Sequence, residues 1–261
     1  MNTGESDKAT LLALARKAAK VLGEQASTPS ERADICLDLL KKDNNDARLS
    51  RFQEHLYTLP VEARHYWIGT LYTLLLPAKV RRSQAAYFTP PNVANAVVDL
   101  AIEAGFNMER DSVLDPAAGG AAFLSTIARR LKDTRQDCTD VARRLYGIEI
   151  DEGLARLSRS LIEEQLGAKL PKNSIETADA LKTSTAKSFN LVIANPPYGR
   201  ISLDEVHGEE WKQISHSGHI NKYALFAELA FRLAQAGGLV VLVIPSSFRA
   251  GPLYDKMREF V

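Results

Sequence analysis

Four consecutive residues have the types and spacing to hold a flat amine: Asn195, Pro196, Pro197 and Tyr198. They follow the apolar run 189–194, which predicts a buried strand, and open α/β sheets hold ligands at the carboxyl ends of their strands. Asn195 offers a side-chain carbonyl and Pro196 a main-chain carbonyl, while the fixed φ of proline keeps the turn extended. Tyr198 adds a ring face for stacking. These groups suit an exocyclic amine such as that of adenine, whose two hydrogens need two acceptors; a simple Pro-Pro turn that ends a strand is the alternative.

Acidic side chains occur at the ends of three further predicted strands, at Asp115, Glu149 and Asp179. The carboxyl ends of parallel strands meet at one edge of a sheet, so we expect these carboxylates to lie near Asn195. Glu149 is placed to accept both hydroxyl groups of a ribose, and Asp179 is placed to accept the amino group of an adenine. Asp151 fits better as the N-cap of the next helix, because its carboxylate can accept a backbone N–H there.

A loop of small residues, 115–124, connects the first of these strands to a helix. Small side chains let a ligand approach the backbone, and a helix N-terminus supplies N–H groups that have no partner within the helix. Tight packing of the strand against the helix would explain the same residues. The loop therefore indicates a ligand site only in combination with the acids and Asn195.

The composition narrows the class of protein. With 261 residues, 45% of them hydrophobic, the chain is long enough for one large domain, or for a domain with a smaller partner. A net charge of +1 creates no global positive field, so nucleic-acid binding would need a local basic patch. Cys36 and Cys138 lie far apart, and neither a signal peptide nor a membrane-spanning stretch is recognisable. We expect a cytoplasmic protein that does not contact a membrane.

Two patterns divide the chain. Residues 1–80 show helical periodicity, with a capping box at 28–31 and helices expected at 7–25, 29–42, 47–59 and 61–76. From residue 112 short apolar runs alternate with helical stretches, which predicts βαβ units. The expected strands are 112–115, 145–150, 174–178, 191–194 and 239–244, and the expected helices are 91–104, 122–132, 152–166 and 221–236, with another starting at 253. These elements predict an α/β fold with a doubly wound, mostly parallel sheet, preceded by an N-terminal helical region.

The order of the motifs resembles the adenine-N6 DNA methyltransferases in which the cofactor-binding half precedes the target-recognition half. Residues 87–91, Tyr-Phe-Thr-Pro-Pro, look like that family's upstream Phe/Tyr-Thr-Pro element, and 115–124 looks like its Asp-Pro-x-x-Gly-x-Gly-x-Phe-Leu loop. Residues 222–226 and 237–245 are similar to the helix and strand that follow the family's Asn-Pro-Pro-Tyr turn. The resemblance covers residues 80–248 and implies the fold of class I S-adenosylmethionine-dependent methyltransferases.

This resemblance implies a role for each site. Asn195, Pro196, Pro197 and Tyr198 would be the catalytic residues and hold the target base, which must leave the stack of double-stranded DNA. The cofactor would be S-adenosyl-L-methionine, bound by Tyr87, Thr89, Pro90, Asp115, Pro116, Ala117, Gly119, Glu149, Ile150, Asp179, Ala180 and Asn195. The family also implies a place in a restriction-modification or phage-defence system. No metal is needed, because a sulfonium is already an activated methyl donor.

Two features depart from the family pattern. Ala121 stands where the loop usually has a second glycine, and an alanine held at positive φ is strained. The family also has further sheet strands and a target-recognition domain, for which there are no residues after Val261. We therefore expect an N-terminal helical region at 1–80 and a methyltransferase domain at 81–261 that lacks the last strands. Target recognition would come from a separate domain or subunit, and the chain would be a fragment of a longer enzyme or one half of a split one.

The segment 199–220 contains His207, His216 and His219. Zinc sites need a fourth ligand and usually cysteine partners at fixed spacing, which this segment lacks. We predict no metal site, and expect a loop that faces DNA.

Two other functions remain open. Methyltransferases that modify glutamine side chains of proteins at N5 also carry Asn-Pro-Pro-Tyr, because a planar amide nitrogen poses the same orbital problem. The 87–91 element and Asp115-Pro116 favour the DNA enzymes over these and over amine-directed RNA methyltransferases. The second possibility is a non-catalytic subunit that binds cofactor or a partner, motivated by Ala121 and the missing carboxyl-terminal half.

Overall fold

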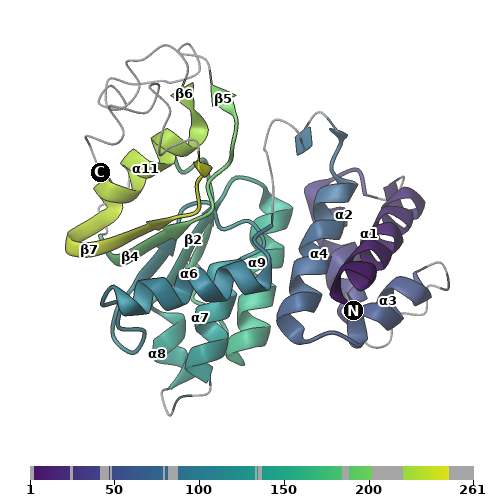
Figure 1. Cartoon of the computed structure of the whole chain (residues 1–261), viewed down its shortest axis with the longest axis horizontal. Helices are drawn as coiled ribbons and strands as arrows, with labels where there is room; N and C mark the ends of the chain where they lie inside the picture. The colour runs from purple at the N-terminus through teal and green to yellow at the C-terminus, as the bar shows by residue number, and fades with distance from the viewer. Residues whose placement is uncertain are drawn as a thin grey trace.

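The computed structural model of the chain describes residues 3–23, 26–41, 47, 49–78, 80–81, 88–132, 134, 137–183, 188–201 and 220–246. Four N-terminal helices lie beside an α/β unit, and helix α9 stands where the two meet (Figure 1). Among the described residues, no helix is both long enough and apolar enough to cross a bilayer.

The N-terminal helices are α1 (Thr3–Leu22), α2 (Pro29–Leu39), α3 (Ser50–Tyr57) and α4 (Val61–Leu75). The capping box expected at the start of α2 is confirmed: the Thr28 hydroxyl accepts the Glu31 N–H, and the Glu31 carboxylate accepts the Thr28 N–H. Trp67 and Tyr72 of α4 are buried in the core of this group. We call α1 to α4 the helical head.

The sheet has five parallel strands among the described residues. They are β1 (Val113–Asp115), β2 (Leu145–Glu149), β3 (Ile175–Thr177), β4 (Phe189–Ala194) and β7 (Ala234–Leu242), in the order β3-β2-β1-β4-β7. The strand order reverses between β1 and β4, and such a switch point leaves a crevice at the carboxyl ends of the two strands. The predicted doubly wound parallel sheet is confirmed.

Helices cover both faces of the sheet. Successive residues of each strand point to opposite sides, and apolar side chains on both sides must be buried. Leu191 and Ile193 pack with α6 (Pro91–Glu103) and α7 (Ala122–Lys132), whereas Val192 packs with α11 (Lys222–Leu233) on the other face. Strands buried on both faces read as continuous apolar runs, which is the pattern that the sequence shows at 189–194.

Helix α9 (Glu152–Leu166) belongs to two cores at once. Ala155 and Ile162 pack into the core beneath the sheet, while Leu157 and Leu161 are fully buried among the helices of the head. The head is therefore attached through a helix that also supports β2 and β3.

Some boundaries differ from the expected ones. The short helix α8 (Cys138–Ala142) was not predicted, and the expected helix 221–236 ends at Leu233, where β7 begins. Ala234 pairs with Phe189, and the pairing shifts before Leu239 meets Leu191, so sheet pairing overrides the helical pattern of 234–236.

The two ends of the predicted loop 199–220 form a short antiparallel pair of strands. These strands are β5 (Arg200–Ile201) and β6 (Ile220–Asn221). The helix expected from 253 and the three histidines lie outside the described residues.

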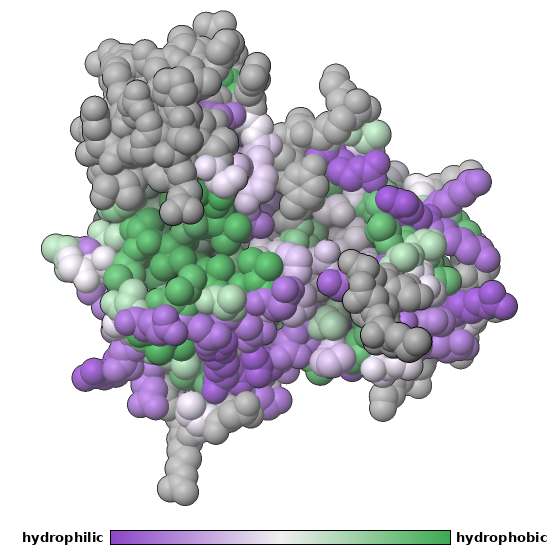
Figure 2. Space-filling model, in the orientation of Figure 1, coloured by the Kyte–Doolittle hydropathy of each residue, from purple (hydrophilic) through white to green (hydrophobic). Residues whose placement is uncertain are grey.

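The molecule also exposes apolar surface. Figure 2 shows a hydrophobic area in the part of the α/β unit where Figure 1 places β7 and α6. Leu100 and Ile102 of α6 are exposed, and residues 239–242 of β7 are half-buried.

Candidate active site

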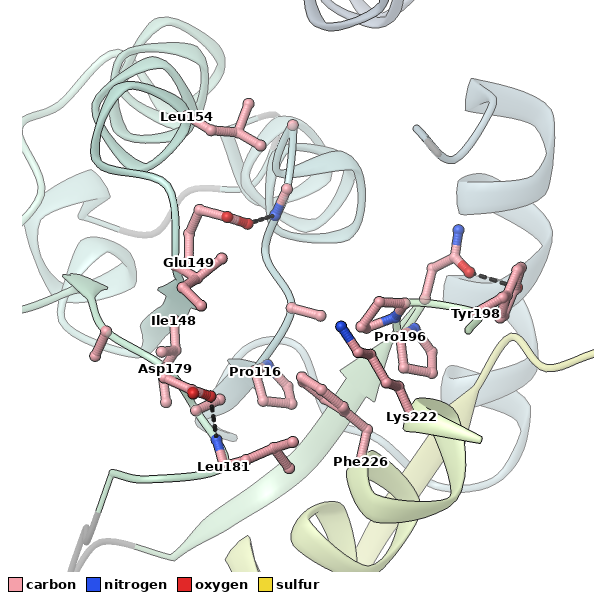
Figure 3. A pocket seen from close by; sticks show the side chains of 18 of the residues that line it. Pro116, Ile148, Glu149, Leu154, Asp179, Leu181, Pro196, Tyr198, Lys222 and Phe226 are labelled. Carbon is pink, nitrogen blue, oxygen red and sulfur yellow. Dashed lines mark hydrogen bonds between the residues drawn. The ribbon is translucent and has the colours of Figure 1, made fainter. Parts of the chain in front are cut away.

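A cavity of about 220 Å³ opens at the carboxyl ends of β1, β2 and β4 (Figure 3). In this view Glu149 and Asp179 lie on one side of the cavity, and Pro196 and Tyr198 lie on the other. The cavity is lined by Phe88, Pro116, Ala117, Gly119, Gly120, Ile148, Glu149, Ile150, Leu154, Ala178, Asp179, Ala180, Leu181, Asn195, Pro196, Pro197, Tyr198, Ile201, Lys222 and Phe226. The structure therefore brings together all four residues of the Asn-Pro-Pro-Tyr turn and most of the predicted cofactor residues.

The side chain of Asn195 is held in one orientation. Its Nδ2 donates to Thr89 Oγ1 over 3.1 Å, and its Oδ1 accepts a hydrogen bond from the Tyr198 hydroxyl over 2.6 Å. The same hydroxyl lies 2.9 Å from the carbonyl oxygen of Val243, just after β7, so its one proton is shared between two acceptors. Burial raises the pKa of Tyr198, which keeps the hydroxyl protonated as a donor.

The loop after β1 uses backbone conformations that glycine favours. Gly119 has φ 50° and Ala121 has φ 57°, so the positive φ expected at Ala121 is confirmed. A left-handed alanine costs on the order of 1–2 kcal/mol, and here the residue is fully buried in the sheet core. The carbonyl oxygen of Gly119 accepts the Ser158 hydroxyl of α9, which helps to hold the loop in place.

Asp115 lies beneath this loop and does not line the cavity. Its carboxyl is buried, and Oδ1 accepts the Ala117 N–H over 3.0 Å. Burial raises its pKa to about 8, and the negative charge of nearby Glu149 adds to the shift. The structure thus separates Asp115 from the two acids that face the cavity.

Glu149 joins two loops of the cavity. Oε2 accepts the Gly119 N–H and Oε1 accepts the Asp151 N–H, both over 2.9 Å. Burial raises the pKa of Glu149, with the charge of Asp151 contributing, while the two backbone N–H groups oppose the shift. Each oxygen of a carboxylate can accept a second hydrogen bond, so the group keeps acceptor capacity for a ligand.

Asp179 faces the cavity after β3. Oδ1 accepts the Leu181 N–H over 3.1 Å, and Oδ2 lies 3.3 Å from the Lys182 ammonium. Beside it, Ile150 is 57% exposed and lines the same cavity, which provides apolar surface next to the acids.

Besides Asp115, two of the described residues predicted to bind the cofactor do not line this cavity. Thr89 lines a smaller neighbouring pocket and contacts Asn195 from there, and Pro90 forms the N-cap of α6. Tyr87 lies outside the described residues.

The structure adds cavity residues that the sequence did not single out, among them Phe88, Ile148 and Phe226. A Cβ on Gly120, or on Gly69 of α4, would overlap the ring of Phe88, so this ring sits between two glycines that are far apart in the chain. Phe226 ends a sequence string that resembled the family, and that string was the available signal. Phe88 lies within the 87–91 element, which also resembled the family, whereas its packing between two distant glycines has no local signal.

No cluster of three or more histidine, cysteine, aspartate or glutamate side chains suited to a metal ion occurs among the residues that the structure describes. Both cysteines are free thiols, with Cys36 buried in the head.

The parallel sheet and the cavity at its switch point define the class of fold, that of class I S-adenosylmethionine-dependent methyltransferases. A crystal structure from Listeria monocytogenes, assigned as such a methyltransferase, aligns with 100% of this chain and 79% of that chain, with a TM-score of 0.59 and 17% sequence identity. At this identity the likeness concerns the fold alone. Residues 65–259 match the model of the N-6 DNA Methylase family, and the chain belongs to this family.

Two curated relatives illustrate the family. The type II methyltransferase M.TthHB8I of Thermus thermophilus is 28% identical over 197 residues, covering 72% of this chain and 40% of that protein. The type I restriction enzyme EcoKI methylase subunit of Escherichia coli is 24% identical over 216 residues, covering 74% of this chain and 38% of that protein. The chain spans about two-fifths of the length of these relatives.

Proposed function

We propose that the protein transfers a methyl group from S-adenosyl-L-methionine to N6 of an adenine extruded from double-stranded DNA. The observation that carries the proposal is the shared cavity: the Asn-Pro-Pro-Tyr turn after β4 faces the same hollow as Glu149 and Asp179. Membership of the N-6 DNA Methylase family supports adenine as the target.

The residues of the cavity suit this cofactor. Glu149 has acceptor capacity for the ribose hydroxyls, Asp179 is an acceptor for the adenine amino group, and exposed Ile150 offers apolar surface to the purine. The positive φ of Gly119 and Ala121 turns the backbone sharply at the entry to α7, where unpaired N–H groups favour a carboxylate. When bound, the cofactor supplies the methyl group as a sulfonium.

Asn195 and Pro196 hold the target amine in this proposal. A carbonyl oxygen has two lone pairs, so Oδ1 of Asn195 can accept an amine hydrogen beside the Tyr198 hydroxyl. The carbonyl of Pro196 takes the other hydrogen, which directs the nitrogen lone pair out of the ring plane. Catalysis then rests on orientation and on well-placed acceptors.

The ring of Tyr198 stacks on the extruded base. Stacking of a base on an aromatic side chain contributes about 1–3 kcal/mol, which offsets part of the few kcal/mol needed to extrude it. Tyr223 of α11 braces this ring edge-on, with the ring centroids 6.4 Å apart.

The setting of the proposed reaction is a restriction-modification or phage-defence system in the cytoplasm. Relatives of this chain are named as type II methyltransferases and as a methylase subunit of a type I restriction enzyme. We propose that residues 81–261 form the catalytic domain and residues 1–80 a helical region. Recognition of the DNA sequence would come from a further domain or subunit.

Two rival functions make different predictions. A glutamine-N5 protein methyltransferase would bind the cofactor and modify protein instead of DNA, and a non-catalytic subunit would not transfer methyl groups at all. The match to the N-6 DNA Methylase family favours the DNA enzyme over both.

The Asn195→Ala variant tests the proposal. We expect it to lose methyl transfer to DNA by at least about 100-fold while its affinity for S-adenosyl-L-methionine changes less than threefold, because the amide contacts the target amine. The measurements are mass spectrometry of nucleosides after incubation with labelled cofactor, and calorimetry for cofactor binding. Asn92→Ala, an exposed asparagine on α6, is the matched control and should match the wild type.

Undiminished methylation by Asn195→Ala would refute the role of the amide. Failure of the wild type to bind the cofactor would refute the proposed function as a whole.

A further inference from the structure

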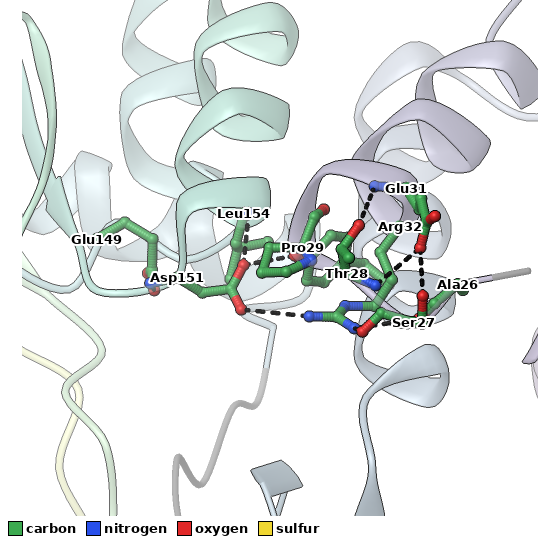
Figure 4. Close-up of polar contacts among 10 residues, drawn as sticks. Ala26, Ser27, Thr28, Pro29, Glu31, Arg32, Glu149, Asp151 and Leu154 are labelled. Carbon is green, nitrogen blue, oxygen red and sulfur yellow. Dashed lines mark hydrogen bonds and ion pairs between the residues drawn. The ribbon is translucent and has the colours of Figure 1, made fainter.

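A buried cation of the head faces the acid that caps helix α9 (Figure 4). Arg32 of α2 lies with Nη2 3.9 Å from Oδ2 of Asp151, and their side chains are only 6% and 8% exposed. Nη1 of Arg32 donates to the carbonyl oxygens of Ala26 and Ser27, each over 3.1 Å. Removing one partner of such a buried pair would leave the other charge uncompensated, in a place where water screens it weakly.

A second group of the head binds the same carboxylate. The hydroxyl of Tyr72 of α4 donates to Oδ1 of Asp151, and Oδ1 also accepts the Leu154 N–H over 2.9 Å as the N-cap of α9. Burial raises the pKa of Tyr72, and the hydrogen bond to Asp151 raises it further, so the hydroxyl stays a donor at any physiological pH. The Arg32 guanidinium also lies 5.8 Å above the Tyr72 ring, which ties the two head residues to each other.

Asp151 in turn holds the acid in the cavity. Its backbone N–H donates to Oε1 of Glu149, whose other oxygen accepts the Gly119 N–H of the loop after β1. A continuous chain of contacts therefore runs from Arg32 and Tyr72, through Asp151, to Glu149. Neither Arg32 nor Tyr72 lines the cavity.

The backbones of head and sheet also approach each other closely at this point. A Cβ on Gly153, in the first turn of α9, would overlap the carbonyl oxygen of Pro29 and the hydroxyl of Tyr72. At the loop after β1, Phe88 fills the space between Gly69 of α4 and Gly120. The head thus braces both loops that Glu149 connects.

We infer that Arg32 and Tyr72 are positioning residues for the cofactor site: by fixing Asp151 they hold Glu149 in the geometry that binds the ribose hydroxyls. The helical head is then part of the cofactor-binding apparatus, in addition to any contact with DNA. The inference rests on the proposed function, because it takes Glu149 as the ribose ligand.

The Tyr72→Phe variant tests the inference, since it removes only the hydroxyl and keeps the buried ring. We expect its affinity for S-adenosylhomocysteine, measured by calorimetry, to fall about tenfold, which is within the usual range of coupling between sites. For a 2′,3′-dideoxyribose analogue of the same ligand we expect no difference between variant and wild type, because Glu149 has no hydroxyl to bind there.

Asp34→Asn is the matched control. Asp34 pairs with Arg156 over 2.6 Å, so this exposed ion pair also joins α2 to α9, but it does not contact Asp151. The control variant should bind S-adenosylhomocysteine as the wild type does.

A double-mutant cycle separates positioning from general weakening of the fold. In the Glu149→Gln background the Tyr72→Phe substitution should have little further effect on affinity, because both act on one contact. An effect of the same size in both backgrounds, or equal affinities of wild type and Tyr72→Phe, would overturn the inference.

Hydrogen exchange gives a readout that needs no ligand. The amides of Gly119 and Asp151, which donate to Glu149, should exchange about tenfold faster in Tyr72→Phe and unchanged in Asp34→Asn. If the wild type bound no cofactor, the proposed function would fail, while the exchange of these two amides would still decide whether Tyr72 positions Glu149. Unchanged exchange would overturn the positioning role.

Discussion

At the scale of single residues, Asp115 places a buried carboxyl under the loop that shapes the cavity. Its pKa, raised to about 8 mainly by burial, means that the folded protein binds a proton which the unfolded chain releases above about pH 4. The stability that this group contributes is therefore fully present at low pH and is lost as the pH rises toward 8.

Replacing this carboxyl should flatten the dependence of stability on pH. We expect the free energy of unfolding of the wild type to fall by about 3 kcal/mol more than that of Asp115→Asn between pH 6 and pH 9. Asparagine keeps an oxygen for the Ala117 N–H, so the loop retains that bond. Urea unfolding at the two pH values measures the difference, and parallel curves for the two proteins would contradict the raised pKa.

Tyr198 contributes a ring and a hydroxyl, and substitutions separate the two. Tyr198→Phe keeps the stacking face and removes the donor to Asn195 and Val243, so we expect binding of target DNA within about threefold of the wild type. Tyr198→Ala loses the stacking, which should cost about 1–3 kcal/mol in binding of the extruded base. Fluorescence of 2-aminopurine at the target position reports extrusion; equal losses in the two variants would mean that the hydroxyl matters and the ring does not.

At the scale of elements, the head approaches the α/β unit closely at Gly153. Glycine in a helix is normally less stable than alanine by about 0.5–1 kcal/mol. Here a Cβ would overlap backbone atoms of Pro29, which cannot move without shifting the start of α2. The steric term therefore outweighs the helical preference.

We expect Gly153→Ala to lower the free energy of unfolding by about 1–3 kcal/mol. Gly23→Ala serves as the control, because a Cβ there would meet no atom within 4 Å, and its stability should equal or slightly exceed that of the wild type. Thermal unfolding of both variants provides the comparison. A stabilised Gly153→Ala would show that the two units are not held at the distance described.

Local sequence patterns predicted some features of the elements correctly and one feature wrongly. The capping box of α2, the N-cap Asp151 and the strand ends at Asp115 and Glu149 were predicted, because each depends on residues close together in the chain. The start of β7 was predicted wrongly, since it depends on pairing with Phe189, which is distant in the sequence.

At the scale of the whole molecule, head and α/β unit share helix α9. Leu157 and Leu161 are buried among head residues, whereas Ile162 and Leu166 are buried beneath the sheet. Separating the units would expose one apolar face of this helix to water, at about 25 cal/mol for each Å². We therefore expect the two units to unfold together.

Equilibrium unfolding in urea tests this coupling. Trp67 is buried in the head, so its fluorescence in a Trp211→Phe background reports the head, while far-UV circular dichroism reports all helices and strands. The two probes should give one midpoint, as for a single cooperative unit. Two separated midpoints would indicate that the head folds independently and would weaken its role in the cofactor site.

The sequence by itself determined the fold class, the strand ends that carry the acids and the Asn195–Tyr198 turn. These features follow from hydrophobic period and from proline, both of which act over a few residues. Only the tertiary structure placed Asp115 beneath the loop and set Arg32 against Asp151. The packing of α2 and α4 on α9 decides which distant side chains meet, and no local pattern encodes that packing.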